Sequence, residues 1–274
     1  MQQSGTNGNA HPTRRDFLQT VAAGAAGFTA LTAGAAEAGR KPNVVIIFTD
    51  DQGWGDLSLH GNRNLDTPHI DRLAQRGATF DNFYVQPVCA PTRAELLTGR
   101  WYPRTGVHGV TRREEWMSLD EVTLGDVFKE GGYATGCFGK WHNGSAYPYH
   151  PNGRGFDEFY GFCCGHWGHY FDSTLEHNGR EVRADGYIND AVAEHALDFI
   201  NENRHDPFLC YVAFNTPHSP FQVPDKWYEK FANRELAMRH RKPGKEETEK
   251  TRCVLAMCEN IDWNVGRIVE RIQD

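Results

Sequence analysis

The sequence predicts an α/β fold in which helices cover both faces of a mostly parallel sheet. Three observations carry this prediction. Short apolar runs rich in β-branched residues, typical of strands buried on both faces, recur along the chain. They alternate with segments that have the apolar periodicity of amphipathic helices. Strand and helix signals that alternate in this way indicate βαβ units.

Three runs are predicted to be strands. Residues 43–49 form the strongest, with four consecutive β-branched residues before a phenylalanine. Residues 133–138 form a weaker run, and residues 207–214 form the third. Because each run is separated from the next by at least one helical segment, we expect the strands to be parallel.

Four segments are predicted to be helices. Two of them begin with a threonine in the capping position and end at glycine. The other two are recognised by apolar residues that recur on one face. In the longest, apolar residues recur at steps of four and three. We expect residues 143–185, which lack a clear period, to form a long loop, and residues 234–252 to be a solvated surface. The four helical segments are residues 67–77, 123–132, 188–200 and 246–272.

Composition limits the class of protein. The chain has 274 residues, of which 39% are hydrophobic and 24% are charged, so it is neither disordered nor polytopic in a membrane. Its net charge of −7 gives no reason to expect a nucleic acid partner. Seven cysteines in a chain of this length are too few for a disulfide scaffold.

Residues 1–38 have the organisation of an export signal. Arg14 and Arg15 precede an uncharged Ala/Gly-rich stretch, and Ala36-Glu37-Ala38 offers a small-x-small cleavage site. The paired arginines resemble the twin-arginine signal of bacteria, which implies the twin-arginine export machinery as a partner and a periplasmic or extracellular location. A membrane anchor is the alternative, although Ala and Gly favour membrane insertion only weakly.

Polar side chains follow each predicted strand: Asp50 and Asp51 the first, Lys140 and His142 the second, and His218 the third. The carboxyl ends of parallel strands lie at one edge of a sheet, so these side chains are expected to converge on one crevice. Two carboxylates suit Ca²⁺ or Mg²⁺, and a lysine implies an anionic substrate group. The pattern therefore favours a metal-dependent hydrolase or transferase acting on an oxyanion ester, although adjacent aspartates are as often only a turn with a helix cap.

The segment 89–100, Cys-Ala-Pro-Thr-Arg-Ala-Glu-Leu-Leu-Thr-Gly-Arg, is the most specific motif. Spacing alone leaves open that Cys89 is a buried cysteine at a helix start. The segment nevertheless resembles the C-x-P-x-R signature of the type I sulfatases, members of the alkaline phosphatase superfamily. In that family the cysteine is oxidised to formylglycine, whose hydrate is the nucleophile, by a formylglycine-generating maturation enzyme.

Four further motifs, which stand in the family's order, support the resemblance. It covers essentially Lys41 to the end of the chain and implies the family's fold, sulfate-ester hydrolysis and a sulfated carbohydrate or aryl sulfate substrate. The motifs are residues 50–53, 67–74, 139–142 and 217–220.

The resemblance also implies roles for single residues. Asp50 and Asp51 would bind Ca²⁺ together with the modified Cys89, and Arg93 would hold the formylglycine hydrate. Lys140 would contact a sulfate oxygen, where it offsets developing charge. The two histidines would act on protons: His142 beside the hydrate hydroxyl, and His218 near the leaving oxygen as the general acid.

Some family features have no counterpart in the sequence. The family completes its metal site with a later Asp-Asn pair, adds a second sulfate-binding lysine, and carries a smaller C-terminal domain. Asp262 is the one acid of interest near the C-terminal end, and its place within a helical pattern favours a packing or capping role. We therefore expect residues 39–274 to be the N-terminal part of a sulfatase catalytic domain, incomplete at its C-terminal end.

Several alternatives stay open. The function alternatives are a phosphatase or phosphodiesterase of the same superfamily, which would carry Ser or Thr in place of Cys89, and an inactive remnant that only binds a sulfated glycan. Residues 163–169 contain soft metal ligands without a Cys-x-x-Cys spacing, so a substrate loop is favoured over a zinc site. Four aromatic residues in the same region form either a sugar-stacking surface or the loop's own core: Tyr147, Tyr149, Trp167 and Tyr170.

Because half of the family's ligand set has no counterpart here, we expect the 274-residue chain to bind Ca²⁺ weakly and to hydrolyse sulfate esters poorly or not at all. The measurement is turnover of an aryl sulfate by this chain and by a version extended at the C-terminus. Equal turnover by the two proteins would contradict the expectation.

Overall fold

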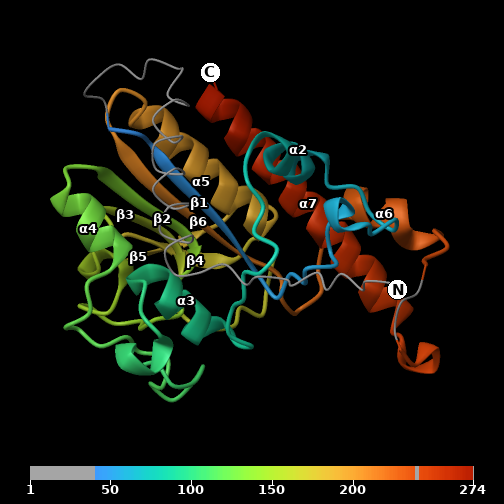
Figure 1. The fold of residues 1–274 in the computed structure, drawn as a ribbon, viewed down its shortest axis with the longest axis horizontal. Coiled ribbons are helices and arrows are strands. Elements are labelled where there is room, and N and C mark those ends of the chain that lie inside the picture. The colour runs from blue at the N-terminus through green and yellow to red at the C-terminus, as the bar shows by residue number, and fades with distance from the viewer. Residues whose placement is uncertain (1–40, 238–240, 274) are drawn as a thin grey trace, which may run out of the picture. The chain divides into compact units, whose positions relative to one another are not determined.

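The computed structural model describes residues 41–237 and 241–273. In these residues the strands form one six-stranded sheet with the order β1-β6-β2-β3-β4-β5 (Figure 1). The predicted export signal, residues 1–38, lies outside the described residues. The strands are β1 (Val44–Asp50), β2 (Ala134–Lys140), β3 (Glu158–Phe162), β4 (Thr174–His177), β5 (Arg180–Arg183) and β6 (Phe208–Pro217).

The sheet is mixed and mostly parallel, as predicted. β1, β6, β2 and β3 run parallel to one another, whereas β4 and β5 add an antiparallel edge. β6 is the most buried strand, and all ten of its residues are buried. It lies between β1 and β2, although both precede it in the sequence, so the three predicted strands are direct neighbours.

Helices cover both faces of the sheet, which confirms the predicted architecture (Figure 1). One apolar cluster joins α5 and α7 to the sheet, and a second joins α3 and α4 to the opposite face. Alternate residues of β6 enter the two clusters, Cys210 the first and Tyr211 the second, as the period of two in a strand requires. The helices are α2 (Pro68–Arg76), α3 (Cys89–Thr98), α4 (Leu124–Glu130), α5 (Ile188–Glu202), α6 (Asp225–Ala232) and α7 (Thr248–Gln273), and the short 3₁₀ turns are η1 (Ser58–His60), η2 (Tyr102–Thr105), η3 (Pro151–Gly153) and η4 (Pro243–Lys245).

The prediction that residues 143–185 form one long loop is wrong, because β3, β4 and β5 lie within them. These strands are short and carry charged residues or glycine, so they lack the apolar run of a central strand. The turn between β4 and β5 has a recognisable signal, Asn178-Gly179, in which both residues have positive φ angles, 49° and 79°. An Asn-Gly pair between two strands is typical of a two-residue hairpin. Helix α6 was not predicted either.

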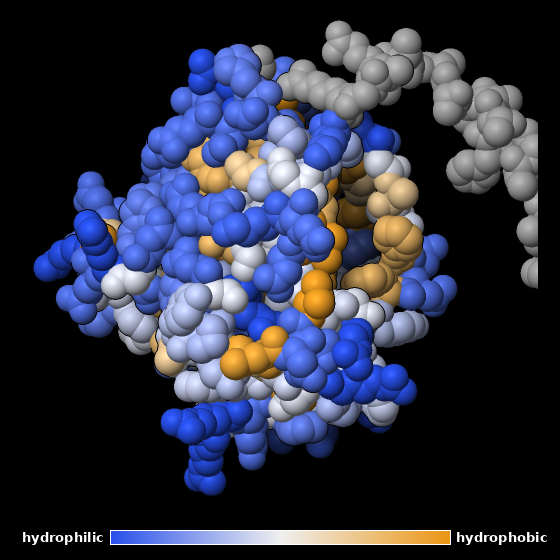
Figure 2. All heavy atoms as spheres, turned by 90° about the vertical axis from the view of Figure 1, so that its left-hand side faces the viewer, coloured by the Kyte–Doolittle hydropathy of each residue, from blue (hydrophilic) through white to orange (hydrophobic). Residues whose placement is uncertain are grey.

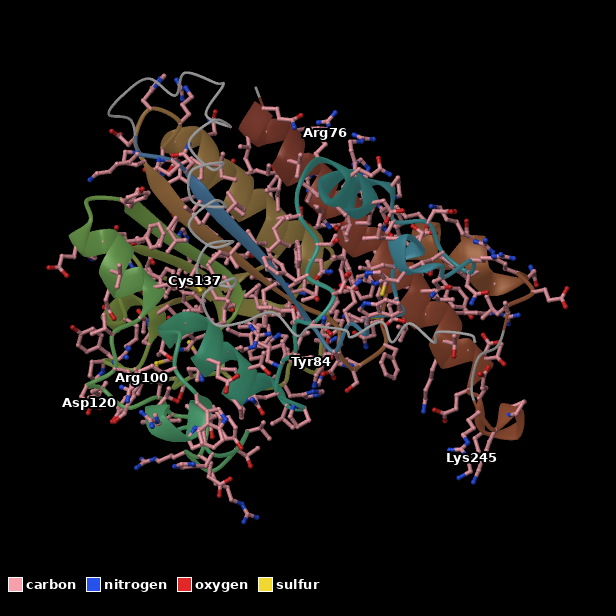
Figure 3. All side chains as sticks on the ribbon, viewed as in Figure 1. Arg76, Tyr84, Arg100, Asp120, Cys137 and Lys245 are labelled. Atoms are coloured by element: carbon pink, nitrogen blue, oxygen red, sulfur yellow. The ribbon has the colours of Figure 1, made fainter. Side chains whose placement is uncertain are left out.

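The seven cysteines all lie in the described part of the chain and are free thiols. Cys137 and Cys210 are fully buried in the central strands, and Figure 3 labels Cys137 within the sheet. Burial raises the pKa of the Cys137 thiol far above its usual range. These two cysteines therefore pack as small apolar residues.

The surface is largely polar. The face shown in Figure 2 is mainly hydrophilic, with hydrophobic residues in small groups. Described residues within the predicted solvated stretch, 234–252, are exposed or half-buried. Within residues 41–237 and 241–273, no helix has both the length and the apolar character that a membrane span requires.

Helix α2 is capped by a side chain from α7. Thr67 occupies the capping position but makes no capping hydrogen bond with its side chain. The backbone N–H groups of His69 and Ile70 instead donate to the carboxylate of Asp262, at 3.2 and 2.8 Å. This confirms the predicted capping role of Asp262, and it explains why a buried acid is accepted in the middle of a long helix.

Asp262→Ala removes both acceptors and leaves two N–H groups at the start of α2 without partners. We expect the free energy of unfolding to fall by about 1–2 kcal/mol, measured by urea denaturation. Asp198→Ala, an exposed position on α5, is the matched control and is expected to change it by less than about 0.5 kcal/mol. Equal effects of the two substitutions would show that Asp262 does not hold α2.

Candidate active site

The ends of β1, β6 and β2 meet at one edge of the sheet and bring the predicted site residues together. Asp50 is the last residue of β1 and stands opposite Pro217, the last residue of β6. Lys140 is the last residue of β2, and His218 directly follows β6. The crevice predicted from strand order is therefore present.

Asp50 is the centre of a buried group of charges. Its carboxylate accepts a hydrogen bond from Lys140 Nζ, and Arg93 Nη2 lies 3.5 Å from its other oxygen. Asp50 is 4% exposed, Lys140 1% and Arg93 0%. Burial by itself raises the pKa of the Asp50 carboxyl, but the charges of Arg93 and Lys140 outweigh it and hold that pKa below its usual value. The group thus contains two cations for one anion.

Arg93 lies one turn into α3, where it connects that helix to the sheet. Its Nη1 donates to the backbone carbonyl of Lys140 at 2.8 Å and lies 3.5 Å from the hydroxyl of Tyr211 in β6. The guanidinium also lies over the ring of Phe48, 5.2 Å from its centroid. Sequence reasoning missed Tyr211, because a tyrosine inside a buried strand is indistinguishable from an ordinary core residue.

Cys89 is the first residue of α3 and is half-buried. Together with Asp50 and Asp51 it lines a cavity of about 230 Å³. Asp51 adopts a positive φ of 63° immediately after β1, and its side chain is 62% exposed. The cysteine and both aspartates of the predicted site therefore face one space.

His142 is held in a single orientation. Its Nε2 donates to the carbonyl of Val110 at 2.9 Å, so its Nδ1 is the unprotonated nitrogen. Nδ1 is buried and has no hydrogen-bond partner among the described residues. Burial, together with the charge of Lys140, lowers the pKa of His142 to about 4. The imidazole is therefore neutral at neutral pH and has one free acceptor atom.

Gly165 lies against the His142 ring. A Cβ atom at position 165 would lie 2.2 Å from His142 Nε2, so only glycine fits there without moving the ring. This contact was not predicted, because it joins two segments that are distant in the sequence. It shows that residues 163–169 pack beside the site.

His218 lies beside the second aspartate. Its Nε2 is 3.7 Å from an Asp51 carboxylate oxygen, and its Nδ1 donates to the carbonyl of Ser219 at 2.7 Å. The hydroxyl of Tyr170 donates to the backbone carbonyls of both His218 and Ser219, which fixes this segment. His166 was not singled out from the sequence, yet its ring centroid is 5.4 Å from that of His218.

The four aromatic residues considered as a stacking surface do not form one. Tyr170 is buried, and Trp167 stacks on the ring of Phe162 at the edge of the core. Tyr149 contacts Trp116, and Tyr147 alone of the four is largely exposed, at 78%. Trp167 and Tyr170 instead pack in the large apolar cluster that joins α5 and α7 to the sheet, so neither a stacking surface nor a separate core of the loop describes them.

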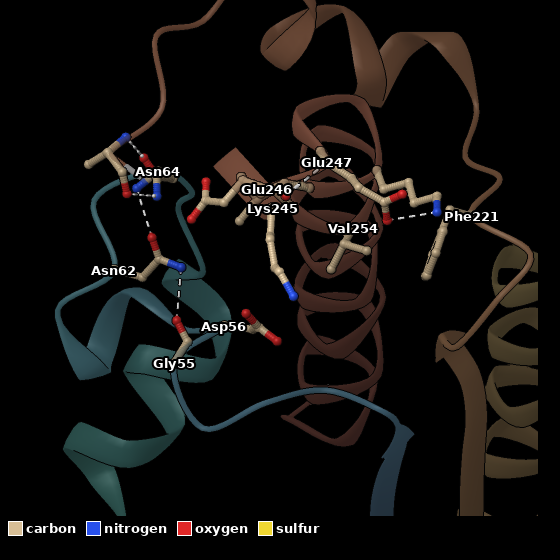
Figure 4. Close-up of a pocket in the computed structure, with 13 residues that line it drawn as sticks. Gly55, Asp56, Asn62, Asn64, Phe221, Lys245, Glu246, Glu247 and Val254 are labelled. Carbon is tan, nitrogen blue, oxygen red and sulfur yellow. Dashed lines mark hydrogen bonds and ion pairs between the residues drawn. The ribbon is translucent and has the colours of Figure 1, made fainter. Parts of the chain in front are cut away.

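A larger cavity of about 540 Å³ lies between residues 55–64 and the start of α7 (Figure 4). None of the predicted site residues lines it. Figure 4 shows that polar groups around it pair with one another: Asn62 donates to the carbonyl of Gly55, and Lys250 pairs with Glu247. The predicted site residues therefore lie at the edge of the sheet, where Asp50, Asp51 and Cys89 line the smaller cavity.

Comparison with curated proteins finds sulfatases. The chain is 31% identical over 271 residues to human N-acetylgalactosamine-6-sulfatase, an alignment that covers 88% of this chain and 48% of the human protein. It is 44% identical over 131 residues to dog arylsulfatase G, covering 47% of this chain and 24% of that protein. The chain thus spans half the length or less of these relatives.

Solved structures share the fold. The crystal structure of Ps i-CgsB matches with a TM-score of 0.73 and 32% identity, over 85% of this chain and 55% of that one. The phosphonate monoester hydrolase of Agrobacterium radiobacter matches with a TM-score of 0.62 and 20% identity, over 85% of this chain and 59% of that one, and at this identity it shows the fold alone.

The family model described as Sulfatase matches residues 42–274, which is the whole sheet with all of its helices. With this match and the relatives above, the chain belongs to the sulfatase family.

Proposed function

We propose that this protein hydrolyses sulfate esters through a formylglycine derived from Cys89. The observation that carries the proposal is the position of Cys89, which begins α3 and faces the cavity of Asp50 and Asp51. Arg93, one turn further along the helix, brings a buried cation to the same place. A C-x-P-x-R segment in a member of the sulfatase family is the sequence that such a modification requires.

The modified residue would supply a hydrate hydroxyl as the nucleophile toward sulfur. The other residues bind the ester and move protons. Lys140 and Arg93 place two positive charges where a sulfate group binds, with only Asp50 to neutralise them. His142 accepts a proton at its free Nδ1. His218, whose Nδ1–H stays bonded to the Ser219 carbonyl, donates from Nε2 to the leaving oxygen when the ring is doubly protonated.

The residues fit a calcium ion in part. Asp50, Asp51 and residue 89 would hold it, and once the Cys89 thiol is converted all three would present the oxygen donors that Ca²⁺ prefers. Each carboxylate oxygen has two lone pairs, so Asp50 can bind an ion while it also accepts from Lys140. When bound, the ion would neutralise negative charge on the sulfate.

The substrate class that we propose is a sulfated carbohydrate, although an aryl sulfate is also compatible with the site. The names of the relatives support a carbohydrate: N-acetylgalactosamine-6-sulfatase in human, and Ps i-CgsB in a complex with k-i-k-neocarrahexaose. The exposed imidazole of His166, whose ring centroid is 5.4 Å from that of His218, is a group near the site that a sugar would reach.

We also propose that the protein is exported by the twin-arginine machinery to the periplasm or beyond. The support is the sequence of residues 1–38 alone. This machinery carries proteins that have already folded. Formylglycine formation would therefore take place in the cytoplasm, before export. The maturation enzyme is thus a second proposed partner.

Co-expression with a formylglycine-generating enzyme is expected to convert Cys89 to an aldehyde, detected by mass spectrometry of the peptide that contains it. Cys164, which is exposed but lies in no C-x-P-x-R segment, is the internal control and is expected to stay a thiol. An intact thiol at Cys89 would contradict the proposed catalysis.

Hydrolysis assays with an aryl sulfate and the matching aryl phosphate then distinguish the three proposed functions. We expect any turnover by the converted chain to be of an aryl sulfate, with the matching aryl phosphate left intact, and to vanish in Cys89→Ala. Phosphate hydrolysis would favour the phosphatase alternative, whose fold neighbour is the phosphonate monoester hydrolase. If Cys89 is converted but neither ester is hydrolysed, and the chain binds a sulfated glycan, the inactive glycan-binding alternative would be favoured.

The role proposed for His142 needs a neutral imidazole, and this can be measured through stability. The pKa of His142 is about 4 in the folded chain, below the value of 6.5 expected when it is unfolded. Between these values the unfolded chain binds a proton that the folded chain does not. The contribution of His142 to the free energy of unfolding is therefore largest above about pH 6.5. It falls by on the order of 3 kcal/mol as the pH drops to about 4.

Urea unfolding over this pH range is expected to have a shallower pH slope in His142→Gln than in the parent. His205→Gln removes an exposed histidine and is expected to keep the parent's slope. If both variants keep that slope, folding does not lower the pKa of His142, and the neutral imidazole proposed for the folded site is contradicted.

A further inference from the structure

Three side chains outside the proposed active site bring metal-binding atoms together. They are His150, Cys163 and Glu176, and their donor atoms all lie within 4.8 Å of one another. The residues come from three separate segments, and none has a role in the sulfate chemistry above. Cys163 is 9% exposed and His150 7%, so the group lies mostly beneath the surface.

Regular structure positions each of the three. His150 directly precedes the turn η3, and Cys163 directly follows β3. Glu176 lies in β4, where it pairs with Gly161 of β3. Ligands on paired strands are held more precisely than ligands on free loops, so the sheet fixes the position of Glu176 and the starting point of Cys163.

The ring of His150 has an unusual environment. Its Nε2 lies 2.5 Å from Glu176 Oε1, but the two are not aligned as a hydrogen bond, and this buried nitrogen has no hydrogen-bond partner among the described residues. A buried nitrogen that makes an ion pair but has no aligned hydrogen bond is a feature that a bound ion would account for.

The donor set indicates which ion. One imidazole, one thiol and one carboxylate supply nitrogen, sulfur and oxygen, the combination typical of zinc and unlike the all-oxygen set of calcium. We propose that His150, Cys163 and Glu176 bind a thiophilic divalent cation of the zinc class. Glu176 is partly exposed, so the fourth position of a tetrahedral ion would face solvent.

Binding has a defined proton balance. Cys163 loses its thiol proton to solvent and binds as a thiolate. An imidazole that binds through Nε2 carries its proton on Nδ1, which accepts a hydrogen bond from the Asn152 N–H at 3.2 Å in the metal-free protein. That single long hydrogen bond is lost when the ion enters, so the Asn152 amide reports on occupancy.

The test is a titration of the full chain with Zn²⁺ alone, in excess Ca²⁺ so that the carboxylates of Asp50 and Asp51 do not compete. Native mass spectrometry is expected to show one zinc ion per chain. Cys163→Ser and His150→Ala are each expected to weaken zinc binding at least about 100-fold. Cys164→Ser and His177→Ala, exposed neighbours of the proposed ligands, are expected to bind zinc as the parent does.

Cobalt provides a spectroscopic readout that does not depend on comparing zinc affinities between variants. Co²⁺ bound by the unsubstituted chain is expected to show thiolate-to-metal charge-transfer absorption, lost in Cys163→Ser and kept in Cys164→Ser. The proposal is overturned if the unsubstituted chain binds no zinc in excess Ca²⁺, or if Cys163→Ser binds zinc as tightly as Cys164→Ser. Neither result depends on whether the chain hydrolyses sulfate esters.

Discussion

The carboxylate of Asp50, buried between Arg93 and Lys140, connects the elements that form the site. It joins the end of β1 to α3 through Arg93 and to the end of β2 through Lys140. Three charges without water around them are stable only as a group, and removing one partner from a buried ion pair costs about 3–5 kcal/mol. The group also keeps a surplus of one positive charge. The contact that closes this edge of the sheet therefore also prepares it for an anion.

Much of the fold was predictable because its central elements have simple sequence patterns. Residues 44–48 and 207–214 are apolar throughout and form strands, of which β6 is fully buried and β1 is half-buried. The steps of four and three in residues 246–272 match one face of α7. The edge strands could not be found in this way. β4 and β5 are half exposed and four residues long each, so only their Asn178-Gly179 turn carried a signal.

The site was predictable in its members but not in its contacts. Strand order is sufficient to bring Asp50, Lys140 and His218 to one edge, because parallel strands end on the same side. It does not reveal that Val110 selects the protonated nitrogen of His142, or that Gly165 leaves room for the ring. Such contacts depend on how loops fold back over the sheet, and loops carry no periodicity from which to read them.

The place of β6 in the sheet has a consequence for synthesis. β1 and β2 do not pair with each other, since each pairs with β6, which begins at Phe208. A growing chain therefore carries the apolar strand β1 without a partner until most of the sequence has left the ribosome. During that interval Cys89 is not yet enclosed by the sheet. An enzyme that modifies it would meet an accessible segment in the nascent chain, before the folded edge closes around Arg93.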